Sequence, residues 1–131
     1  MRRTHPAAAA LLLALASVLD SAAARSSCEV APFQGATLPQ GATTTMHVAA
    51  GSSCSIVSYG KPSERAHPAD SGRVTRQPAH GKAEFVAPKV TYTPDRGYAG
   101  ADEFEYEALA RATSDRPVQL KVRVKVQVTA P

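Results

Sequence analysis

The sequence predicts an all-β protein: a single antiparallel β-sandwich of about seven to eight strands with one disulfide. Three observations lead to this prediction. Apolar and polar residues alternate with a period of two in many short segments, and no window after residue 24 keeps the 3.6-residue period of an amphipathic helix. Turns rich in Gly, Pro and Ser separate these segments at the spacing of a sandwich. The chain also has only two cysteines, Cys28 and Cys54.

The first 24 residues have the pattern of an export signal. Arg2 and Arg3 are followed by an apolar run over residues 7–19, and residues 22–24 are three alanines that suit a signal peptidase. The apolar run is shorter than the roughly 20 residues that span a bilayer as a helix. We therefore expect residues 1–24 to be removed, leaving an exported domain, periplasmic or extracellular, without stable membrane insertion.

Residues 25–131 are enough for one domain and too few for two. The formal net charge is +4 for the whole chain, and it falls by one when residues 1–24 leave. Because the cations form no dense cluster, we do not expect a nucleic-acid partner. Export would place Cys28 and Cys54 where disulfides persist. Their pairing would close a loop of about 25 residues and stabilise the fold by roughly 3 kcal/mol.

Seven or eight strands are expected along the chain. In order, they cover residues 28–30, 44–48, 54–59, 73–77, 82–86, 89–93, 103–108 and 118–128. The last strand is the clearest, because Leu120 and the valines around it alternate with Lys, Arg and Gln. Residues 34–41, 60–72 and 111–117 are polar and are expected to form surface loops.

The strand at residues 103–108 carries glutamates on its outward parity, while Phe104 and Tyr106 face inward. The glutamates are Glu103, Glu105 and Glu107, and the cations expected opposite them are Lys121, Arg123 and Lys125. A turn centred near residue 113 pairs Glu105 with Lys121, and a shift by two residues pairs it with Arg123. Either register gives opposite charges across the strands, at about 0.2–1 kcal/mol per pair. The acidic row therefore has a structural explanation without a ligand.

A spaced motif covers much of the second half. Its members are Gln77, Pro78, His80, Gly81, Tyr92, Pro94, Tyr98, Gly100, Asp102, Phe104 and Tyr106. With this motif and the valine-rich strand after it, residues 77–128 resemble the bacterial immunoglobulin-like and cadherin-like tandem-repeat modules of secreted adhesins. The resemblance implies a sandwich of about seven strands used for spacing, adhesion or binding, often in calcium-containing surroundings. It does not imply catalysis.

Asp102 has inward parity, so its carboxylate needs a partner. The simplest partners are backbone N–H groups of the turn at residues 95–100. The alternative is a calcium site with Asp95, although calcium takes six to eight oxygen ligands and this loop supplies few. We expect no cofactor other than this possible calcium ion. The rings of Tyr92, Tyr98 and Tyr106 are expected in the core, with the Tyr98 hydroxyl bonded to nearby backbone.

His80 is the histidine that would suggest a general base. No G-x-S-x-G elbow or comparable nucleophile motif accompanies it. The resemblance instead implies that His80 opens a hairpin, in which Gly81 supplies an unusual backbone dihedral. The two cysteines lack the close spacing of a catalytic dithiol. The chain is thus not expected to be an enzyme.

The function expected from the sequence is that of an exported, non-enzymatic binding or structural module. Its partner would be a protein or a glycan, bound through polar loops at the end of the sandwich. The charged loop residues expected to contribute are Arg65, Asp70, Arg111, Asp115 and Arg116. Addition of a strand at a sheet edge is a second route to a partner. The alternatives are a calcium-stabilised structural module and a small secreted inhibitor or enzyme accessory protein.

Overall fold

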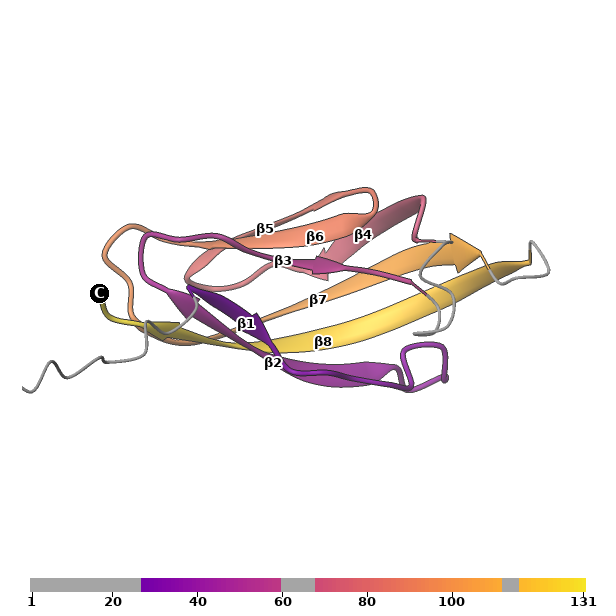
Figure 1. The fold of residues 1–131 in the computed structure, drawn as a ribbon, viewed down its shortest axis with the longest axis horizontal. Helices are drawn as coiled ribbons and strands as arrows, with labels where there is room; N and C mark the ends of the chain where they lie inside the picture. Colours follow the sequence, from indigo (N-terminus) through magenta and orange to yellow (C-terminus); the bar gives the residue numbers. More distant parts are fainter. Residues whose placement is uncertain (1–26, 60–67, 112–115) are drawn as a thin grey trace, which may run out of the picture.

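The computed structural model describes residues 27–59, 68–111 and 116–131, and the regular structure in them is entirely β. Eight strands follow one another along the chain (Figure 1). They are β1 (Cys28–Val30), β2 (Ala42–Ala49), β3 (Cys54–Val57), β4 (Ser71–Arg76), β5 (Gly81–Val86), β6 (Lys89–Pro94), β7 (Gly100–Arg111) and β8 (Pro117–Thr129). The expected export signal lies outside the described residues.

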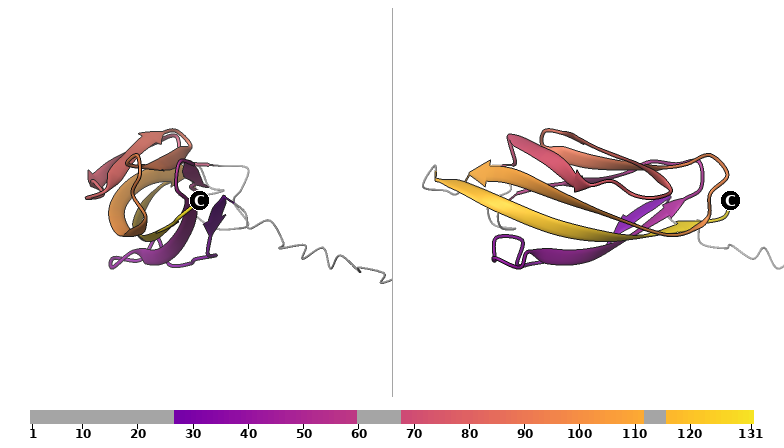
Figure 2. Two further views of the ribbon diagram at one scale, coloured as in Figure 1. Left: turned by 90° about the vertical axis from the view of Figure 1, so that its left-hand side faces the viewer. Right: turned by 180° about the vertical axis from the view of Figure 1, so that it is seen from behind.

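The strands form two sheets that face each other, as the end-on view in Figure 2 shows. One sheet has the order β1-β2-β8-β7-β4, and the other has the order β3-β6-β5. Neighbouring strands are antiparallel except β2 and β8, which run parallel from the pair Ala42 and Val122 to the pair Ala49 and Thr129. The predicted fold class, an all-β immunoglobulin-like sandwich with one disulfide, is confirmed.

The core lies between the sheets and is filled by the inward residues of each strand. Tyr92, Phe104 and Tyr106 have no exposed surface. The Phe104 ring stacks on both tyrosines, with centroid distances of 5.7 Å to Tyr92 and 6.4 Å to Tyr106. The prediction that these two tyrosines belong to the core is confirmed. Tyr98 is half-buried and packs against the core from its edge.

The register between β7 and β8 pairs Glu105 with Arg123, which is the second of the two registers that the alternation allows. Arg123 Nε lies 2.7 Å from Glu105 Oε1 and 3.3 Å from Glu103 Oε1. The hydrogen bond to Glu105 and the charges of both glutamates raise the pKa of Arg123. Because these side chains are solvated, the pairs chiefly fix the register of the two strands.

A disulfide joins Cys28 in β1 to Cys54 in β3, with a Cα–Cα distance of 5.1 Å. The predicted pairing is confirmed. Because β1 belongs to the five-stranded sheet and β3 to the three-stranded sheet, the bond ties the two layers together. Cys54 is buried, so its sulfur also fills part of the core.

The expected loop at residues 60–72 ends earlier than the sequence predicts, because Ser71 and Gly72 already belong to β4. Gly72 is not a turn residue. A Cβ atom on it would lie 2.6 Å from Phe85 Cζ and 2.7 Å from the Glu107 carbonyl oxygen. Glycine is therefore needed here for the close approach of β4 to the Phe85 ring, rather than for a loop conformation.

The sandwich has two distinct ends. We call the end that holds Cys28 and Thr129 the terminal end, and the end that holds Asp70 and Arg111 the loop end. Both β1 and the last residues of β8 reach the terminal end, because β1 is antiparallel to β2 while β2 is parallel to β8 (Figure 1). In the described part of the chain no helix is long and apolar enough to cross a membrane.

Candidate functional site

The Asp102 carboxylate lies near the start of β7, at the terminal end, and accepts four hydrogen bonds. Its Oδ1 accepts from the backbone N–H groups of Ala79 at 3.0 Å and Glu103 at 2.9 Å. Its Oδ2 accepts from the His80 N–H at 3.1 Å and the Tyr92 hydroxyl at 2.7 Å. An ionised carboxylate has about four lone-pair positions. Each position of Asp102 therefore has a donor.

Two of the three backbone donors, Ala79 and His80, come from a different turn than the sequence predicts. The expected partner was the turn at residues 95–100, and the observed partner is the turn that leads from β4 to β5. This turn crosses from one sheet to the other beside Asp102. The 95–100 turn closes on itself instead, because Tyr98 N donates to the Asp95 carbonyl oxygen at 3.1 Å. Sequence distance alone could not reveal which turn lies nearer to Asp102.

Tyr92 connects Asp102 to the three-stranded sheet. Burial, and next the hydrogen bond to Asp102, raise the pKa of Tyr92 far above its usual range. The hydroxyl therefore stays protonated and remains a donor at any ordinary pH. Bonds from a hydroxyl to a carboxylate are short and strong compared with neutral pairs. Asp102 and Tyr92 thus link β7 to β6 across the sandwich, as the disulfide links β1 to β3.

His80 and Tyr98 stack at the same end, with ring centroids 4.1 Å apart and planes 6° from parallel. The Tyr98 hydroxyl donates to the Ala101 carbonyl oxygen, which confirms the expected bond to nearby backbone. The His80 backbone accepts a hydrogen bond from Asp95 N at 2.9 Å. His80 therefore contributes to this end through its ring face and its backbone, as expected for a turn residue.

Gly81 corrects one sequence prediction. It was expected to adopt an unusual backbone dihedral, but its φ is not positive, whereas Gly97 and Gly100 have φ values of 80° and 135°. A Cβ atom on Gly81 would lie 2.6 Å from the Thr93 carbonyl oxygen and 2.8 Å from the Tyr92 ring. Glycine is required at this position because any side chain would collide with these atoms.

For calcium, the expected ligands were Asp102 and Asp95. Among the residues that the structure describes, no three or more His, Cys, Asp or Glu side chains come together in a way that could hold a metal ion. A cation at Asp102 would also have to displace N–H or O–H donors from its oxygens. The arrangement is that of a structural carboxylate bound to protein donors.

The loop end brings together two of the five predicted binding residues. Arg111 Nε lies 3.0 Å from Asp70 Oδ2, and about half of each side chain is exposed. Asp70 is also held by its backbone N–H, which donates to the Leu109 carbonyl oxygen at 3.0 Å. Arg116 is exposed just before β8. Arg65 and Asp115 lie outside the described residues.

A shallow groove lies beside this pair, on the outer face of the five-stranded sheet, with a volume of about 390 Å³. It is lined by Ser71, Gly72, Arg73, Glu107, Ala108, Leu109 and Gln119. Arg73 Nη2 lies 3.3 Å from Glu107 Oε2, and Leu109 is 44% exposed. This groove was not predicted from the sequence. The available signal was Leu109 itself, an apolar residue on the outward parity of the glutamate row.

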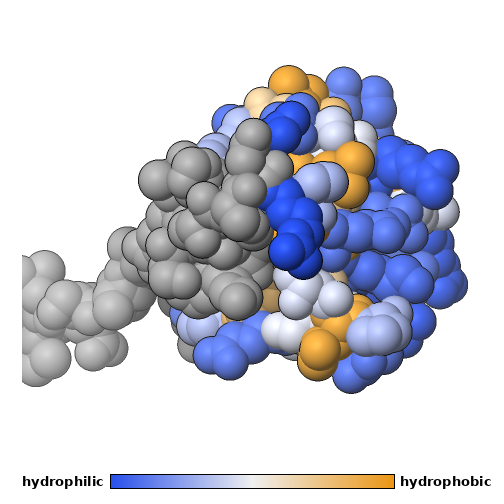
Figure 3. Space-filling view, turned by 90° about the vertical axis from the view of Figure 1, so that its right-hand side faces the viewer, coloured by the Kyte–Doolittle hydropathy of each residue, from blue (hydrophilic) through white to orange (hydrophobic). Residues whose placement is uncertain are grey.

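Figure 3 views the molecule from the loop end. Hydrophilic side chains cover most of the visible surface, and hydrophobic residues form small separate patches among them. The part of this end that is coloured in Figure 3 therefore combines hydrophilic side chains with limited apolar area. No protein-family model matches the chain, and no curated protein matches it.

Proposed function

We propose that this protein is an exported, non-enzymatic binding module that contacts a protein or glycan partner through its loop end. The observation that carries the proposal is the groove at Leu109. There an exposed apolar side chain lies beside the ion pair of Arg73 and Glu107, and close to the ion pair of Asp70 and Arg111. A polar rim around a small apolar centre suits recognition of a partner surface.

The residues whose side-chain types could take part in catalysis support a scaffold role instead. Asp102 and Tyr92 hold the two sheets together, His80 stacks on Tyr98, and the glutamate row pairs with the cations of β8. A side chain that is occupied in this way does not serve a reaction without breaking a structural contact. This favours binding over catalysis.

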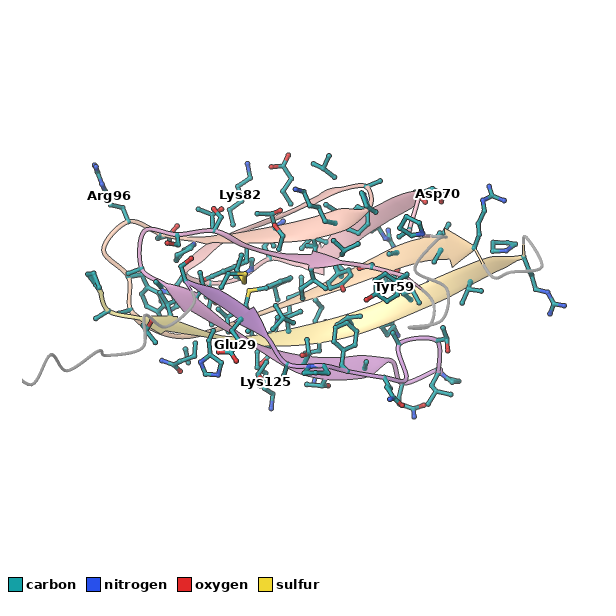
Figure 4. All side chains as sticks on the ribbon, in the orientation of Figure 1. Glu29, Tyr59, Asp70, Lys82, Arg96 and Lys125 are labelled. Atoms are coloured by element: carbon teal, nitrogen blue, oxygen red, sulfur yellow. A yellow bond between two sulfur atoms is a disulfide. The ribbon has the colours of Figure 1, made fainter. Side chains whose placement is uncertain are left out.

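The placement of the chain ends also supports use of the loop end. Ser27 lies at the terminal end, where its carbonyl oxygen accepts from Ala49 N, and the C-terminus lies there too. Figure 4 shows Asp70 at the opposite end from the labelled Arg96. Polypeptide attached before residue 27 or after residue 131 would leave from the terminal end. The loop end would then be presented away from such an attachment.

Export and the adhesin-like role rest on two further points. A disulfide between Cys28 and Cys54 is stable in oxidising compartments. The motif over residues 77–128 resembles modules of secreted adhesins, and it maps here onto the contacts that join the sheets. The proposal therefore places the module in the periplasm or outside the cell.

The test compares two exposed apolar residues on opposite sheets. Leu109→Lys alters the proposed groove, and Val57→Lys makes the same change on the three-stranded sheet, where Val57 is 51% exposed. Both variants and the unaltered protein are assayed on glycan arrays and against extracts of surface and secreted proteins. Any ligand found is then titrated by calorimetry. We expect Leu109→Lys to weaken binding at least about tenfold, or about 1.4 kcal/mol, and Val57→Lys to leave it unchanged. Equal binding by all three proteins would exclude the loop end.

A further inference from the structure

Gln77 is a motif residue whose side chain lies along the edge of a sheet. Its Nε2 donates to the Ala83 carbonyl oxygen at 3.0 Å, and its Oε1 accepts from the Ala83 N–H at 3.1 Å. Ala83 lies in the middle of β5, six residues further along the chain. The carboxamide thus makes both hydrogen bonds that a neighbouring strand would make to Ala83.

The contact matters because β5 is an edge strand of the three-stranded sheet. In an antiparallel pair, alternate residues direct their N–H and C=O groups toward the partner strand and away from it. Ala83 directs both groups away from β6, to Gln77. Gly81 and Phe85 share its parity, so their groups face the same edge. An added strand would bond to these three residues, and Gln77 covers the central one.

The outward side chains of β5 make this edge complementary to itself. Lys82 and Glu84 flank Ala83 and are both exposed, and Figure 4 shows Lys82 directed away from the sandwich. If two β5 strands pair antiparallel with Ala83 opposite Ala83, Lys82 of each copy lies opposite Glu84 of the other. The same register pairs Gly81 with Phe85. All residues that face the edge then pair with one another, giving up to about six hydrogen bonds.

The edge of β4, on the other sheet, is not complementary to itself. It carries Arg73 and Arg76 and has a register shift between Val74 and Arg76. Cations and bulges at an edge oppose pairing with a second chain. Self-pairing through β4 would bring like charges together, whereas self-pairing through β5 brings opposite charges together.

We propose that the Gln77 carboxamide blocks the Ala83 backbone groups on the self-complementary edge of β5. When the carboxamide moves away, β5 pairs with β5 of a second copy of this chain. With Gln77 in place, its intramolecular bonds need no second molecule and keep the edge closed. Without it, the Ala83 backbone groups and the two pairs of Lys82 and Glu84 become available together. The two three-stranded sheets would then join into one continuous sheet.

The experiment measures self-association of the disulfide-bonded protein by sedimentation equilibrium over a wide concentration range. Gln77→Ala is expected to dimerise at least about tenfold more tightly than the unaltered protein, or about 1.4 kcal/mol. Adding Lys82→Glu to Gln77→Ala should abolish the dimer, because it places carboxylates opposite Glu84 of the second copy. Adding Glu84→Lys as well exchanges the two charges and should restore it.

Circular dichroism establishes that each variant is folded before it is measured. Gln77→Glu provides a second variant, because it keeps an acceptor for the Ala83 N–H but places a carboxylate oxygen against the Ala83 carbonyl. It too should dimerise more tightly than the unaltered protein. A folded Gln77→Ala or Gln77→Glu protein that associates no more than the unaltered protein overturns the proposal. So does a dimer that persists after Lys82→Glu, since it would use another surface.

Discussion

At the scale of single residues, Asp102 shows how one carboxylate can hold distant segments together. Its donors include Ala79 and Tyr92, which are 23 and 10 residues away. They belong to the β4–β5 turn and to β6, while Asp102 belongs to β7. Hydrogen bonds to an ionised acceptor contribute more than neutral ones. The residue that looked most like a metal ligand is therefore one of the connections between the two sheets.

Replacement of Asp102 tests this role. In Asp102→Asn, the new NH₂ group faces N–H or O–H donors and leaves at least one of them without an acceptor. We expect a loss of about 1–3 kcal/mol in the free energy of unfolding, measured by urea denaturation. Asp95→Asn is the control, since Asp95 is exposed on the neighbouring turn. It should change stability by less than about 0.5 kcal/mol. Equal losses in both variants would contradict the assignment.

Calcium offers a separate test of the same carboxylate. Because the four lone-pair positions of Asp102 already have protein donors, we expect millimolar calcium to leave the Tm of the protein unchanged. The measurement is a thermal melt with calcium and with a chelator. A Tm increase that disappears in Asp102→Asn would support the calcium-stabilised module instead.

Because Tyr106 is buried, we expect the free energy of unfolding to depend on pH in the alkaline range. Burial raises the pKa of Tyr106 to about 12, although the hydrogen bond with Ser58 acts in the opposite direction. The folded protein therefore holds this proton more tightly than the unfolded chain. The resulting stability is complete below the unfolded pKa of about 10 and is lost as pH rises through about 12.

We therefore expect the free energy of unfolding to fall by roughly 2–3 kcal/mol from this group across that window. The buried Tyr92 adds a further decrease, because its pKa is also raised. Denaturant titrations between pH 9 and pH 12 measure the total. Tyr106→Phe should have a flatter profile and, at neutral pH, lower stability, because Ser58 loses its partner. An unchanged profile in Tyr106→Phe would refute the explanation.

At the scale of secondary-structure elements, close contacts decide where β4 begins and how it lies. The polar composition of residues 68–72 is typical of a loop, but Gly72 allows β4 to approach Phe85 and Glu107. Gly81 likewise allows β5 to approach Thr93 and the Tyr92 ring. Both glycines lie within strands, where the absence of a side chain lets neighbouring atoms come close.

Gly72→Ala tests this account of β4. The added methyl group would meet Phe85 Cζ at 2.6 Å and a backbone oxygen at 2.7 Å, so the strand or the ring must move. We expect a loss of about 1–3 kcal/mol by chemical denaturation. Thr75→Ala in the same strand is the control, because Thr75 is exposed. If the two variants were equally stable, the contact with Phe85 would not be tight.

At the scale of the whole molecule, side-chain bonds between described residues tie the two layers together in addition to apolar packing. The disulfide joins β1 to β3, and the pair of Asp102 and Tyr92 joins β7 to β6. The parallel pairing of β2 with β8 brings both described chain ends to one end of the sandwich. The opposite end carries the groove at Leu109 and the ion pair of Asp70 and Arg111, on which the proposed binding surface is based.

Removal of the disulfide should weaken the whole domain. The double variant Cys28→Ala with Cys54→Ala opens a loop that spans 26 residues of sequence separation. Chain entropy predicts a loss of about 3 kcal/mol in the free energy of unfolding, measured by urea denaturation. Chemical reduction of the unaltered protein is the companion experiment and should lower stability by a similar amount. If neither treatment changes stability, the bond does not restrain the unfolded chain as proposed.

The sequence by itself determined the fold class, the approximate position of every strand, the disulfide pairing and the inward or outward parity of β7 and β8. These features depend on the period of two and on a single possible cysteine pair, which are local or countable properties. It left two registers open for Glu105, because a shift by two residues preserves every parity. The observed pairing with Arg123 came only from the strand register in the structure.

Only the tertiary structure decided the parallel pairing of β2 with β8, the donors of Asp102, the contact of Gln77 with Ala83 and the groove at Leu109. Each of these joins segments whose meeting depends on how the chain crosses from one sheet to the other. Alternation along a strand shows which side of a sheet a residue faces, but it carries no information about which segment lies opposite. That choice is made by packing of the two layers and by the need to satisfy buried polar groups.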